Sequence, residues 1–267
     1  MDTITSSQNP KVKQALKLWK RGERESAQLF LVEGYRELSR ASAADLPIET
    51  LFLCPELFLG ENEQALIHKI GKKAHLIECS KAVFQKLSYR DRPDGLLGIC
   101  RQTHLTLKAL QLTQNPFYIV AESIEKPGNL GTILRSSDAT GVDGVIVCDR
   151  CTDIHNPNVV RASVGTLFTL PVVEATSDET LEWLKKHNIS ILAATPSAST
   201  EYTQVDLTQP IALVVGTEQY GLTQKWMERA DLRVKIPMLG IADSLNVAMA
   251  TTLLLYEVVR QRRSLRR

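Results

Sequence analysis

The chain has 267 residues, of which 43% are hydrophobic and 23% are charged, and its formal net charge is +2. This composition excludes a disordered chain, which would have fewer apolar residues or a larger net charge. No apolar run approaches the roughly 20 residues that span a bilayer, and the first residues lack the apolar core and cleavage site of a signal peptide. We therefore expect a cytoplasmic protein with no membrane partner.

A basic helix is the first predicted element, over about residues 10–20. Six basic side chains lie in or just after it: Lys11, Lys13, Lys17, Lys20, Arg21 and Arg24. A second basic group is at the C-terminus: Arg260, Arg262, Arg263, Arg266 and Arg267. Charge alone leaves open whether either group is solvated surface or contacts nucleic acid.

Four short β-rich runs follow, at residues 29–34, 49–54, 74–79 and 95–100, with amphipathic stretches between them. Strands that alternate with helices predict a small α/β domain. We assign residues 1–105 to this domain. The polar stretch that ends at Pro116 has no strong strand, and residues 106–116 are predicted to be a linker.

A second α/β series begins at residue 117. Five apolar runs rich in Val or Ile, at 117–123, 144–149, 189–195, 211–216 and 232–237, are separated mostly by helical patterns. Strands that are apolar throughout indicate a parallel sheet covered on both faces. A long helix over about residues 244–262 is predicted to close this domain, which we assign to residues 117–267.

Five cysteines in a cytoplasmic chain argue against a disulfide framework. Cys148 and Cys151 form a CxxC, with His155 four residues further on. A zinc site needs a second ligand pair at similar spacing, and a redox pair should open a helix, whereas this segment continues into the turn-rich TDIHNPN. The sequence therefore predicts no metal site here.

The segment EKPGNLGTILRSSDATG, residues 125–141, follows the first strand of the second series. Asn129 is placed to cap the next helix, and Arg135 should project from its first turns near the carboxyl end of the sheet, where open α/β sheets place ligands. The alternative is a structural turn in which Arg135 pairs with Asp138 at i+3.

The segment LVVGTEQYGL, residues 213–222, places Glu218 between two glycines just after a buried strand. Glycines let the backbone approach a ligand closely. The alternative is a surface turn with a solvated glutamate. No GxGxxG occurs in the chain, so the usual dinucleotide turn is missing.

The third segment, residues 236–263, contains SLNVAMA. Ser244 or Asp243 is placed to cap the last helix, with Asn246 just inside it. Because buried polar groups need partners, a site explains Ser244 and Asn246 better than core packing, although a structural cap is the alternative. Small residues would let another backbone pack closely, within the chain or across a dimer: Ala248, Ala250, Thr251 and Thr252.

Together, and in this order, the three segments resemble the signature motifs of the SpoU (TrmH-like) family of RNA ribose 2′-O-methyltransferases, in the SPOUT superfamily. The resemblance covers about residues 117–263 through GNLGTILR, GTEQYGL and SLNVAMA, with support from RASVGTLFTLPVV and ATP. Residues 1–105 resemble the small RNA-binding domain often fused ahead of these enzymes, through NPKVKQ and LFLVEG. Lys126 departs from the Asn or Asp often found before the motif proline.

The resemblance implies an S-adenosylmethionine-dependent enzyme with a deep trefoil knot in its parallel-sheet domain, and a homodimer that builds each active site from both chains. The implied catalytic residues are Arg135, Asn129, Glu218, Ser244 and Asn246. Backbone groups near Thr195, Gly216, Ile236 and Leu245 would hold the methyl donor. RNA would contact Arg161, from its own or the partner chain, and the basic helix through Lys11, Lys13 and Lys17.

In the family the residue that matches Arg135 is proposed to be the base. Arginine has a pKa above about 12 in proteins, so we expect Arg135 to act as a cation that stabilises the developing alkoxide and docks phosphate. Ribosomal RNA is the expected substrate, with tRNA as the alternative. A non-catalytic RNA-binding protein of the same fold should have lost a motif residue, and an ordinary nucleotide-dependent enzyme should carry a Gly-rich phosphate loop.

Overall fold

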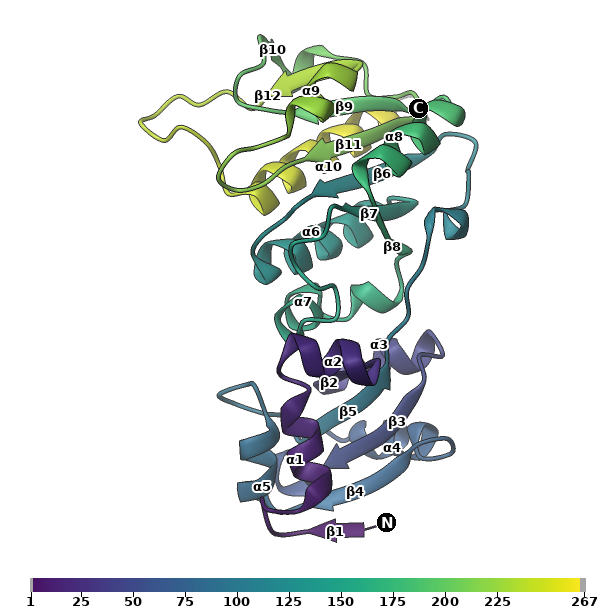
Figure 1. Cartoon of the computed structure of the whole chain (residues 1–267), viewed down its shortest axis with the longest axis vertical. Coiled ribbons are helices and arrows are strands. Elements are labelled where there is room, and N and C mark those ends of the chain that lie inside the picture. The colour runs from purple at the N-terminus through teal and green to yellow at the C-terminus, as the bar shows by residue number, and fades with distance from the viewer. Residues whose placement is uncertain (1, 265–267) are drawn as a thin grey trace. The chain divides into compact units, whose positions relative to one another are not determined.

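The computed structural model describes residues 2–264, and the chain divides into two compact units (Figure 1). The first unit comprises Met1–Thr103 and Asp153–Thr169, and the second comprises His104–Thr152 and Leu170–Arg267. The sequence placed Asp153–Thr169 in the second domain, but its contacts group it with the first unit. All of the predicted linker, 106–116, belongs to the second unit, where Leu110 is buried.

The first unit contains a five-stranded mixed sheet in the order β1-β4-β3-β5-β2. The four predicted strands are present, and a short edge strand that the sequence did not reveal joins β4 in parallel. The strands are β1 (Asp2–Ile4), β2 (Leu29–Glu33), β3 (Ile48–Leu53), β4 (His75–Cys79) and β5 (Leu96–Arg101). Its main helices are α1 (Pro10–Lys17), α2 (Arg21–Ala27), α3 (Tyr35–Ala43), α4 (Glu63–Ile70) and α5 (Lys81–Leu87).

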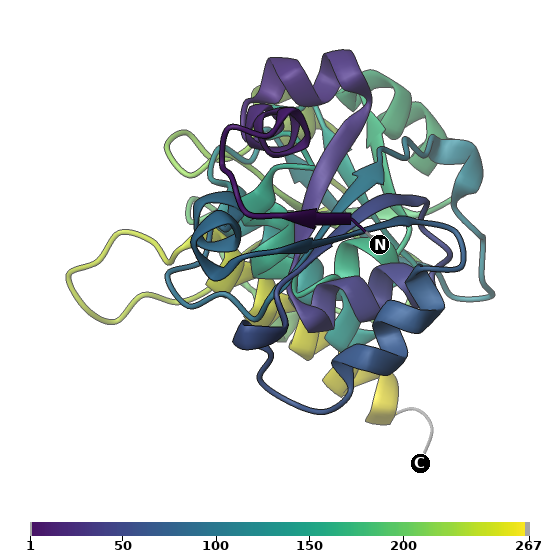
Figure 2. The ribbon, with the colours of Figure 1, turned by 90° about the horizontal axis from the view of Figure 1, so that it is seen from below.

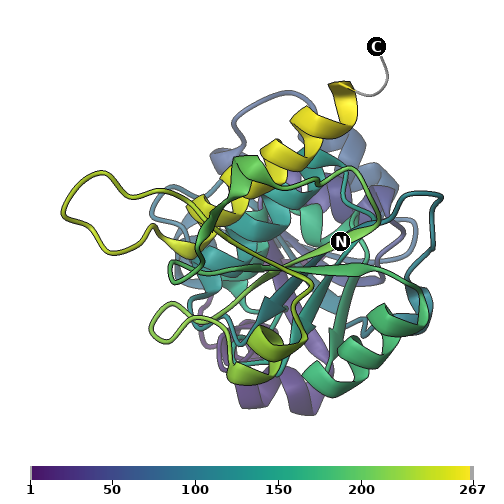
Figure 3. The ribbon, with the colours of Figure 1, turned by 90° about the horizontal axis from the view of Figure 1, so that it is seen from above.

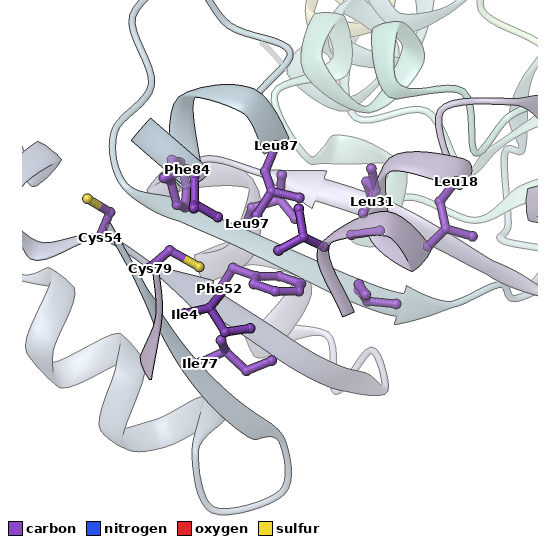
Figure 4. Close-up of a cluster of buried hydrophobic side chains, with 14 residues drawn as sticks. Ile4, Leu18, Leu31, Phe52, Cys54, Ile77, Cys79, Phe84, Leu87 and Leu97 are labelled. Carbon is purple, nitrogen blue, oxygen red and sulfur yellow. The ribbon is translucent and has the colours of Figure 1, made fainter. Parts of the chain in front are cut away.

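Apolar side chains from the sheet, α1 and α5 form one core of this unit (Figure 4). Phe52 and Ile77 come from neighbouring strands, and Phe84 and Leu87 come from α5; all four are fully buried. Because apolar residues recur on one face of α1 and α5, these helices cover the sheet and exclude water from it. Trp19, just after α1, packs against the edge of this core.

The segment Asp153–Thr169 is held to the first unit by a buried ion pair and by ring contacts. The Arg24 guanidinium donates to Asp153 at 3.0 and 2.6 Å, and both side chains are almost fully buried. The His155 and Phe30 rings lie 4.6 Å apart, centroid to centroid. These contacts join residues more than a hundred positions apart, so they group the segment with the first unit although it follows β7 (Gly144–Cys148) in the chain. It contains α7 (Pro157–Ser163) and a 3-10 turn, η3 (Thr166–Phe168).

The second unit contains a seven-stranded sheet in the order β10-β12-β9-β11-β6-β7-β8, with all pairs parallel. The predicted parallel sheet is confirmed, including its five apolar strands. The strands are β6 (Phe117–Glu122), β7 (Gly144–Cys148), β8 (Val172–Ala175), β9 (Ser190–Ala194), β10 (Thr200–Glu201), β11 (Ile211–Val215) and β12 (Leu232–Lys235).

Helices cover both faces of this sheet (Figure 3). The helices α6 (Pro127–Thr140) and α10 (Val247–Ser264) pack against each other on one face, while α8 (Ser177–Lys186) and α9 (Gln224–Arg229) cover the other. The small residues of α10 serve this packing, since Ala248 and Thr251 are buried and the Thr252 hydroxyl lies 2.7 Å from that of Ser136 on α6. Within residues 2–264, no helix is long and apolar enough to cross a membrane.

The segment between β12 and α10 extends away from the rest of the second unit (Figure 1, Figure 2). Leu239 and Ile241 on this segment are 97% and 101% exposed. The segment delays the start of the last helix to Val247, three residues later than predicted.

Candidate functional site

The three sequence motifs meet at one edge of the parallel sheet of the second unit. Strands β12, β9, β11 and β6 are neighbours in that order. Because parallel strands end at the same edge, the segments after their carboxyl ends lie next to one another. These segments carry, in the same order, Ile236, Thr195, Glu218 and Asn129.

Glu218 and Asn129 form the centre of the site. The Asn129 side-chain amide donates to Glu218 Oε1 at 2.7 Å. The Glu218 carboxylate also accepts the backbone N–H groups of Glu125 and Lys126, at 3.1 and 3.2 Å. It therefore satisfies N–H groups just ahead of α6, where the helix dipole also favours a negative charge.

This hydrogen bonding keeps Glu218 ionised. Partial burial raises the pKa of the Glu218 carboxyl, but the hydrogen bonds from the Asn129 amide and from backbone N–H groups outweigh it and lower the pKa below its ordinary value. An ionised carboxylate can only accept hydrogen bonds. It therefore fixes the Asn129 amide with its nitrogen toward Glu218 and its oxygen free for another donor.

Asn246 supplies that donor and joins the third motif to the other two. Its side-chain amide donates to Asn129 Oδ1 at 3.1 Å. Its own oxygen accepts from the backbone N–H groups of Ala248 at 3.0 Å and Met249 at 3.4 Å, which is the pattern of a helix N-cap. The network Asn246–Asn129–Glu218 thus connects residues 129, 218 and 246 through ordered amides.

The caps of both helices differ from the sequence predictions. Asn129 does not cap α6, because the helix begins at Pro127 with Lys126 as its cap residue. Neither Ser244 nor Asp243 caps α10, because Asn246 does. In both cases the polar side chain nearest the predicted helix start was assigned the cap, and the true start lay a few residues away.

Arg135 lies in the third turn of α6 rather than in its first turns. Its side chain is exposed, and it makes no hydrogen bond or ion pair within residues 2–264. The alternative pairing with Asp138 is not found there. The guanidinium therefore keeps all of its donors available for an anionic ligand.

The residues expected to hold a methyl donor lie at the same sheet edge. Thr195 follows β9, and its backbone N–H donates to the Val234 carbonyl at 2.9 Å. A Cβ added at Gly216 would lie 2.3 Å from the Gly221 carbonyl, so only glycine fits where these two backbones approach. Leu245 is 39% exposed at the end of the extended segment.

A comparison with known families decides what this arrangement is. The model of the SpoU rRNA Methylase family matches residues 116–256, and that of the MRM3-like substrate binding domain matches residues 9–98. The chain belongs to the SpoU rRNA methylase family. The predicted class, an S-adenosylmethionine-dependent RNA 2′-O-methyltransferase preceded by a small substrate-binding domain, is confirmed.

Relatives match along nearly the whole chain. The 23S rRNA (uridine(2479)-2′-O)-methyltransferase of Streptomyces viridochromogenes is 31% identical over 92% of this chain and 87% of its own length. A crystal structure of an RNA 2′-O ribose methyltransferase is 40% identical, covers 97% of this chain and 99% of its own, and has a TM-score of 0.87. An AdoMet-bound rRNA methyltransferase from Sinorhizobium meliloti is 29% identical, covers 97% of both chains, and has a TM-score of 0.89.

Besides Arg135, two further predicted site residues, Ser244 and Arg161, are not joined to the network of this SpoU-family site. Ser244 is exposed, and its side chain has no hydrogen-bond partner in the described part of the chain. Arg161 is also exposed, and its place on α7 groups it with the first unit. The structure therefore assigns the ordered part of the site to residues 129, 218 and 246 and leaves Arg135, Ser244 and Arg161 free.

The basic residues of the N-terminal region are not equivalent. Lys13 and Lys17 are exposed and make no ion pair within residues 2–264. Lys11 pairs with Asp2 at 2.9 Å. Arg24 is buried against Asp153 and cannot contact RNA. At the C-terminus, Arg262 is occupied by carbonyl groups, including those of Asn115 at 2.9 Å and Gln209 at 2.8 Å; Arg266 and Arg267 lie outside the described residues.

The sequence did not reveal one acid that supports the site. Glu122, the last residue of β6, is 1% exposed and accepts the backbone N–H and hydroxyl of Thr223, at 3.0 and 2.7 Å. It thereby fixes the end of the Glu218 loop to β6. A charged residue at the end of an otherwise apolar strand was the available signal, because a buried carboxylate needs partners.

The CxxC segment shows no sign of a ligand site. The Cys148 thiol is buried near the Thr180 hydroxyl, 3.1 Å away, and burial raises its pKa to about 12. Cys151 is exposed. Within residues 2–264, no group of three or more His, Cys, Asp or Glu side chains is placed to hold a metal ion.

Proposed function

We propose that this protein methylates a ribose 2′-hydroxyl of 23S ribosomal RNA in the cytoplasm, as a homodimer. The observation that carries the proposal is the Asn246–Asn129–Glu218 network, which joins all three motifs. Arg135 lies on the same helix as Asn129, is exposed, and has no partner within residues 2–264. A relative that matches most of both chains is named for 23S rRNA, which favours ribosomal RNA over tRNA. Two of the three networked residues are amides held in one orientation, as positioning of a substrate requires.

The edge of the sheet fits S-adenosylmethionine, which would supply a methyl group on a positively charged sulfur. Within residues 2–264, the peptide groups of residues 237–245 make no hydrogen bond to other backbone groups. Such groups are available to the adenine edge and the amino-acid part of the donor. Leu245 ends this segment, Ile236 precedes it, and Thr195 and Gly216 follow the neighbouring strands β9 and β11. The apolar side chains of the segment, Leu239 among them, are suited to cover an adenosine.

Arg135 is assigned to the ribose and its phosphate. As the 2′-hydroxyl attacks, its proton would pass to solvent water, and the exposed guanidinium can stabilise the negative charge that develops on the oxygen while it holds a neighbouring phosphate. A nearly always protonated side chain is suited to this role rather than to that of a base. Asn129 and Asn246 then orient the ribose, and Ser244 is available beside them for the donor or the RNA.

An apolar stripe on α10 supports the homodimer. Met249, Leu253 and Tyr256 recur at helical spacing on one side and are 61%, 44% and 52% exposed. Their side of the helix is distinct from that of Ala248 and Thr251, which pack within the chain. A continuous apolar stripe on an otherwise folded domain is the mark of a protein–protein contact.

The contacts of the segment that follows β9 support the trefoil knot. The Gln261 side chain of α10 donates to the Val205 carbonyl at 3.0 Å and accepts from the Leu207 N–H at 2.9 Å. Arg262 donates to the Asn115 carbonyl, ahead of β6. The end of α10 therefore contacts segments from earlier parts of the chain, which is consistent with the proposed threading of the C-terminal part.

Methylation of a 23S rRNA transcript with tritiated donor tests the proposed activity, with a tRNA pool as the comparison. We expect label in the ribosomal transcript, resistant to alkali at one position. Label only in tRNA would reject the substrate.

For the dimer, Leu253→Asp should give a monomer by sedimentation, while Ser264→Asp, which adds the same charge at an exposed position of α10, should not. A wild-type monomer at micromolar concentration would reject the homodimer.

A further inference from the structure

The strongest feature outside the methyl-transfer site is an aromatic stack on the surface of the first unit. The rings of Trp19 and Tyr89 lie 5.0 Å apart, centroid to centroid, with their planes 26° apart. Tyr89 is 46% exposed. One face of its ring lies against Trp19, so the exposed surface belongs to the rest of the side chain.

The stack is fixed in place from three directions. Trp19 packs on the apolar core, and its carbonyl accepts from the buried Arg24 at 2.9 Å. The Tyr89 backbone N–H donates to Glu33 Oε2 at 2.8 Å. Its hydroxyl accepts from the Asn158 side-chain amide on α7 at 2.9 Å. An exposed tyrosine held by so many contacts loses little entropy when a ligand binds.

The loop that carries Tyr89 is held by buried charges. Glu33 is 8% exposed and bonded to the Ser88 hydroxyl as well as to Tyr89. Arg90 donates to the Glu37 carboxylate at 2.6 Å and to the Glu33 carbonyl at 2.9 Å. Because buried carboxylates need partners, Glu33 and Glu37 hold the Ser88–Arg90 loop, and with it the Tyr89 ring, in one position.

One cation without an ion pair lies beside the stack, and two more are close to Trp19 in the chain. Arg161 lines the same small hollow as Trp19 and Tyr89, and it is exposed. Lys20 follows Trp19 directly, and Lys17 is the last residue of α1, two positions before Trp19. None of the three makes an ion pair within residues 2–264. An exposed aromatic face with free cations near it matches single-stranded nucleic acid, whose bases stack and whose phosphates need positive charge.

We propose that Trp19 and Tyr89 form a stacking site for one unpaired base of the substrate RNA, with Arg161 and Lys20 holding the flanking phosphates. The inference rests on the proposed action on RNA and names the structural element of the substrate that the first unit binds. It also gives Arg161 a role that fits its position on α7, outside the amide network. The sequence contains no base-specific donor set here, so the site selects an unstacked base rather than a particular one.

Binding of a 12-nucleotide oligoadenylate to the full chain, compared with the same oligonucleotide carrying abasic sites, tests the proposal. Tyr89→Ala should weaken binding of the oligoadenylate by about 5- to 150-fold, the range for loss of one base–aromatic stack. Tyr89→Phe keeps the ring and should stay within about twofold of wild type. The abasic oligonucleotide should bind wild type and Tyr89→Ala equally. Leu59→Ala removes another exposed apolar side chain, 81% exposed, and should have no effect.

Two outcomes would overturn the inference. One is equal binding of oligoadenylate by wild type and Tyr89→Ala, and the other is an equal loss in Tyr89→Phe and Tyr89→Ala. If Tyr89→Ala does not fold, cross-linking of a 4-thiouridine oligonucleotide to wild type decides, because adducts on residues other than Trp19 and Tyr89 would reject the stack. Methylation of 23S rRNA by wild type distinguishes the two failures: if it occurs while Tyr89 variants bind normally, only the stacking site is wrong.

Discussion

The two units use arginine in opposite ways. Arg24 of the first unit is 1% exposed, bonded to Asp153 and to the carbonyls of Leu18 and Trp19. Arg135 of the second unit is exposed and has no partner within residues 2–264. The same side chain is thus part of the core in one unit and available to a ligand in the other.

This difference shows that the partners of a charge, rather than its position in a basic cluster, decide its role. A buried guanidinium must be compensated by hydrogen bonds, and it then contributes to folding but cannot bind phosphate. An exposed one contributes little to stability but keeps its donors for substrate. Mutation of Arg24 should therefore lower stability, and mutation of Arg135 should lower activity with little change in stability.

The largest effect is expected for Arg24→Ala. The substitution leaves the Asp153 carboxylate buried and uncompensated, which should lower the free energy of unfolding by about 3–5 kcal/mol. Urea unfolding followed by circular dichroism measures it. The matched double variant Arg24→Met with Asp153→Leu removes both charges and should recover most of the loss. A loss below about 1 kcal/mol in Arg24→Ala would contradict the role of this ion pair.

Arg135→Ala should produce the complementary result. Loss of one stabiliser of developing charge lowers the rate of a chemical step by about 10²-fold or more, whereas removal of an exposed, unpaired side chain should leave the melting temperature almost unchanged. Arg135→Lys should rescue poorly, because a point charge does not replace the planar guanidinium. Single-turnover methylation at saturating donor is the measurement. A wild-type rate in Arg135→Ala would remove this residue from the chemical step.

Glu218→Gln should affect both stability and activity, because Glu218 holds the backbone ahead of α6 and also orients Asn129. The carboxylate accepts two backbone N–H groups and the Asn129 amide, so its loss should cost about 1 kcal/mol, discounted for partial exposure, and should misplace Asn129. The expected kinetic effect is a lower kcat with little change in overall fold. Glu182→Gln on α8, outside this network, is the control.

The lowered pKa of Glu218 predicts how the difference in unfolding free energy between wild type and Glu218→Gln depends on pH. Because the folded-state pKa lies below the ordinary 4.5, the ionised carboxylate stabilises the fold above that pH, and the contribution is lost as pH falls through the folded pKa. The stability difference between wild type and Glu218→Gln should therefore shrink on acidification below about pH 4.5. A difference that grows there would mean that the pKa is raised instead.

The fold of the second unit could be predicted from sequence because its signals are local. Apolar strands such as β6 and β11 require cover on both faces, and the motif residues follow the ends of these strands. Their meeting at one sheet edge is a consequence of parallel pairing. Local sequence does not determine which side chain caps α10. That choice depends on where the extended segment ends, and the two earlier polar residues, Asp243 and Ser244, were equally plausible caps.

The first unit shows where sequence reasoning stops. Its four strands were visible, but the grouping of Asp153–Thr169 with it depends on the Arg24–Asp153 pair, 129 positions apart in the chain. The Trp19–Tyr89 stack likewise joins distant residues. Contacts of this kind are chosen by tertiary packing, which neither periodicity nor charge counts record. For the same reason, the N-terminal basic cluster defined from sequence contains both a buried arginine, Arg24, and exposed lysines.

The smallest effect is expected for the lysines of α1, where the same comparison can be made within one helix. Lys17 has no ion pair within residues 2–264, whereas Lys11 is neutralised in part by Asp2. If Lys17 contacts an RNA phosphate, Lys17→Ala should reduce the slope of log affinity against log salt by about 0.7–0.9, because one fewer counterion is released. Lys11→Ala should reduce it less, since Asp2 already competes for that charge. Lys73→Ala, at an exposed position paired with Asp45 far from α1 in sequence, should leave the slope unchanged. Titrations of oligoadenylate between about 50 and 200 mM salt measure these slopes. Equal slopes for wild type and Lys17→Ala would place the phosphate contacts elsewhere, and a larger effect for Lys11 than for Lys17 would mean that the Asp2 pair opens when RNA binds.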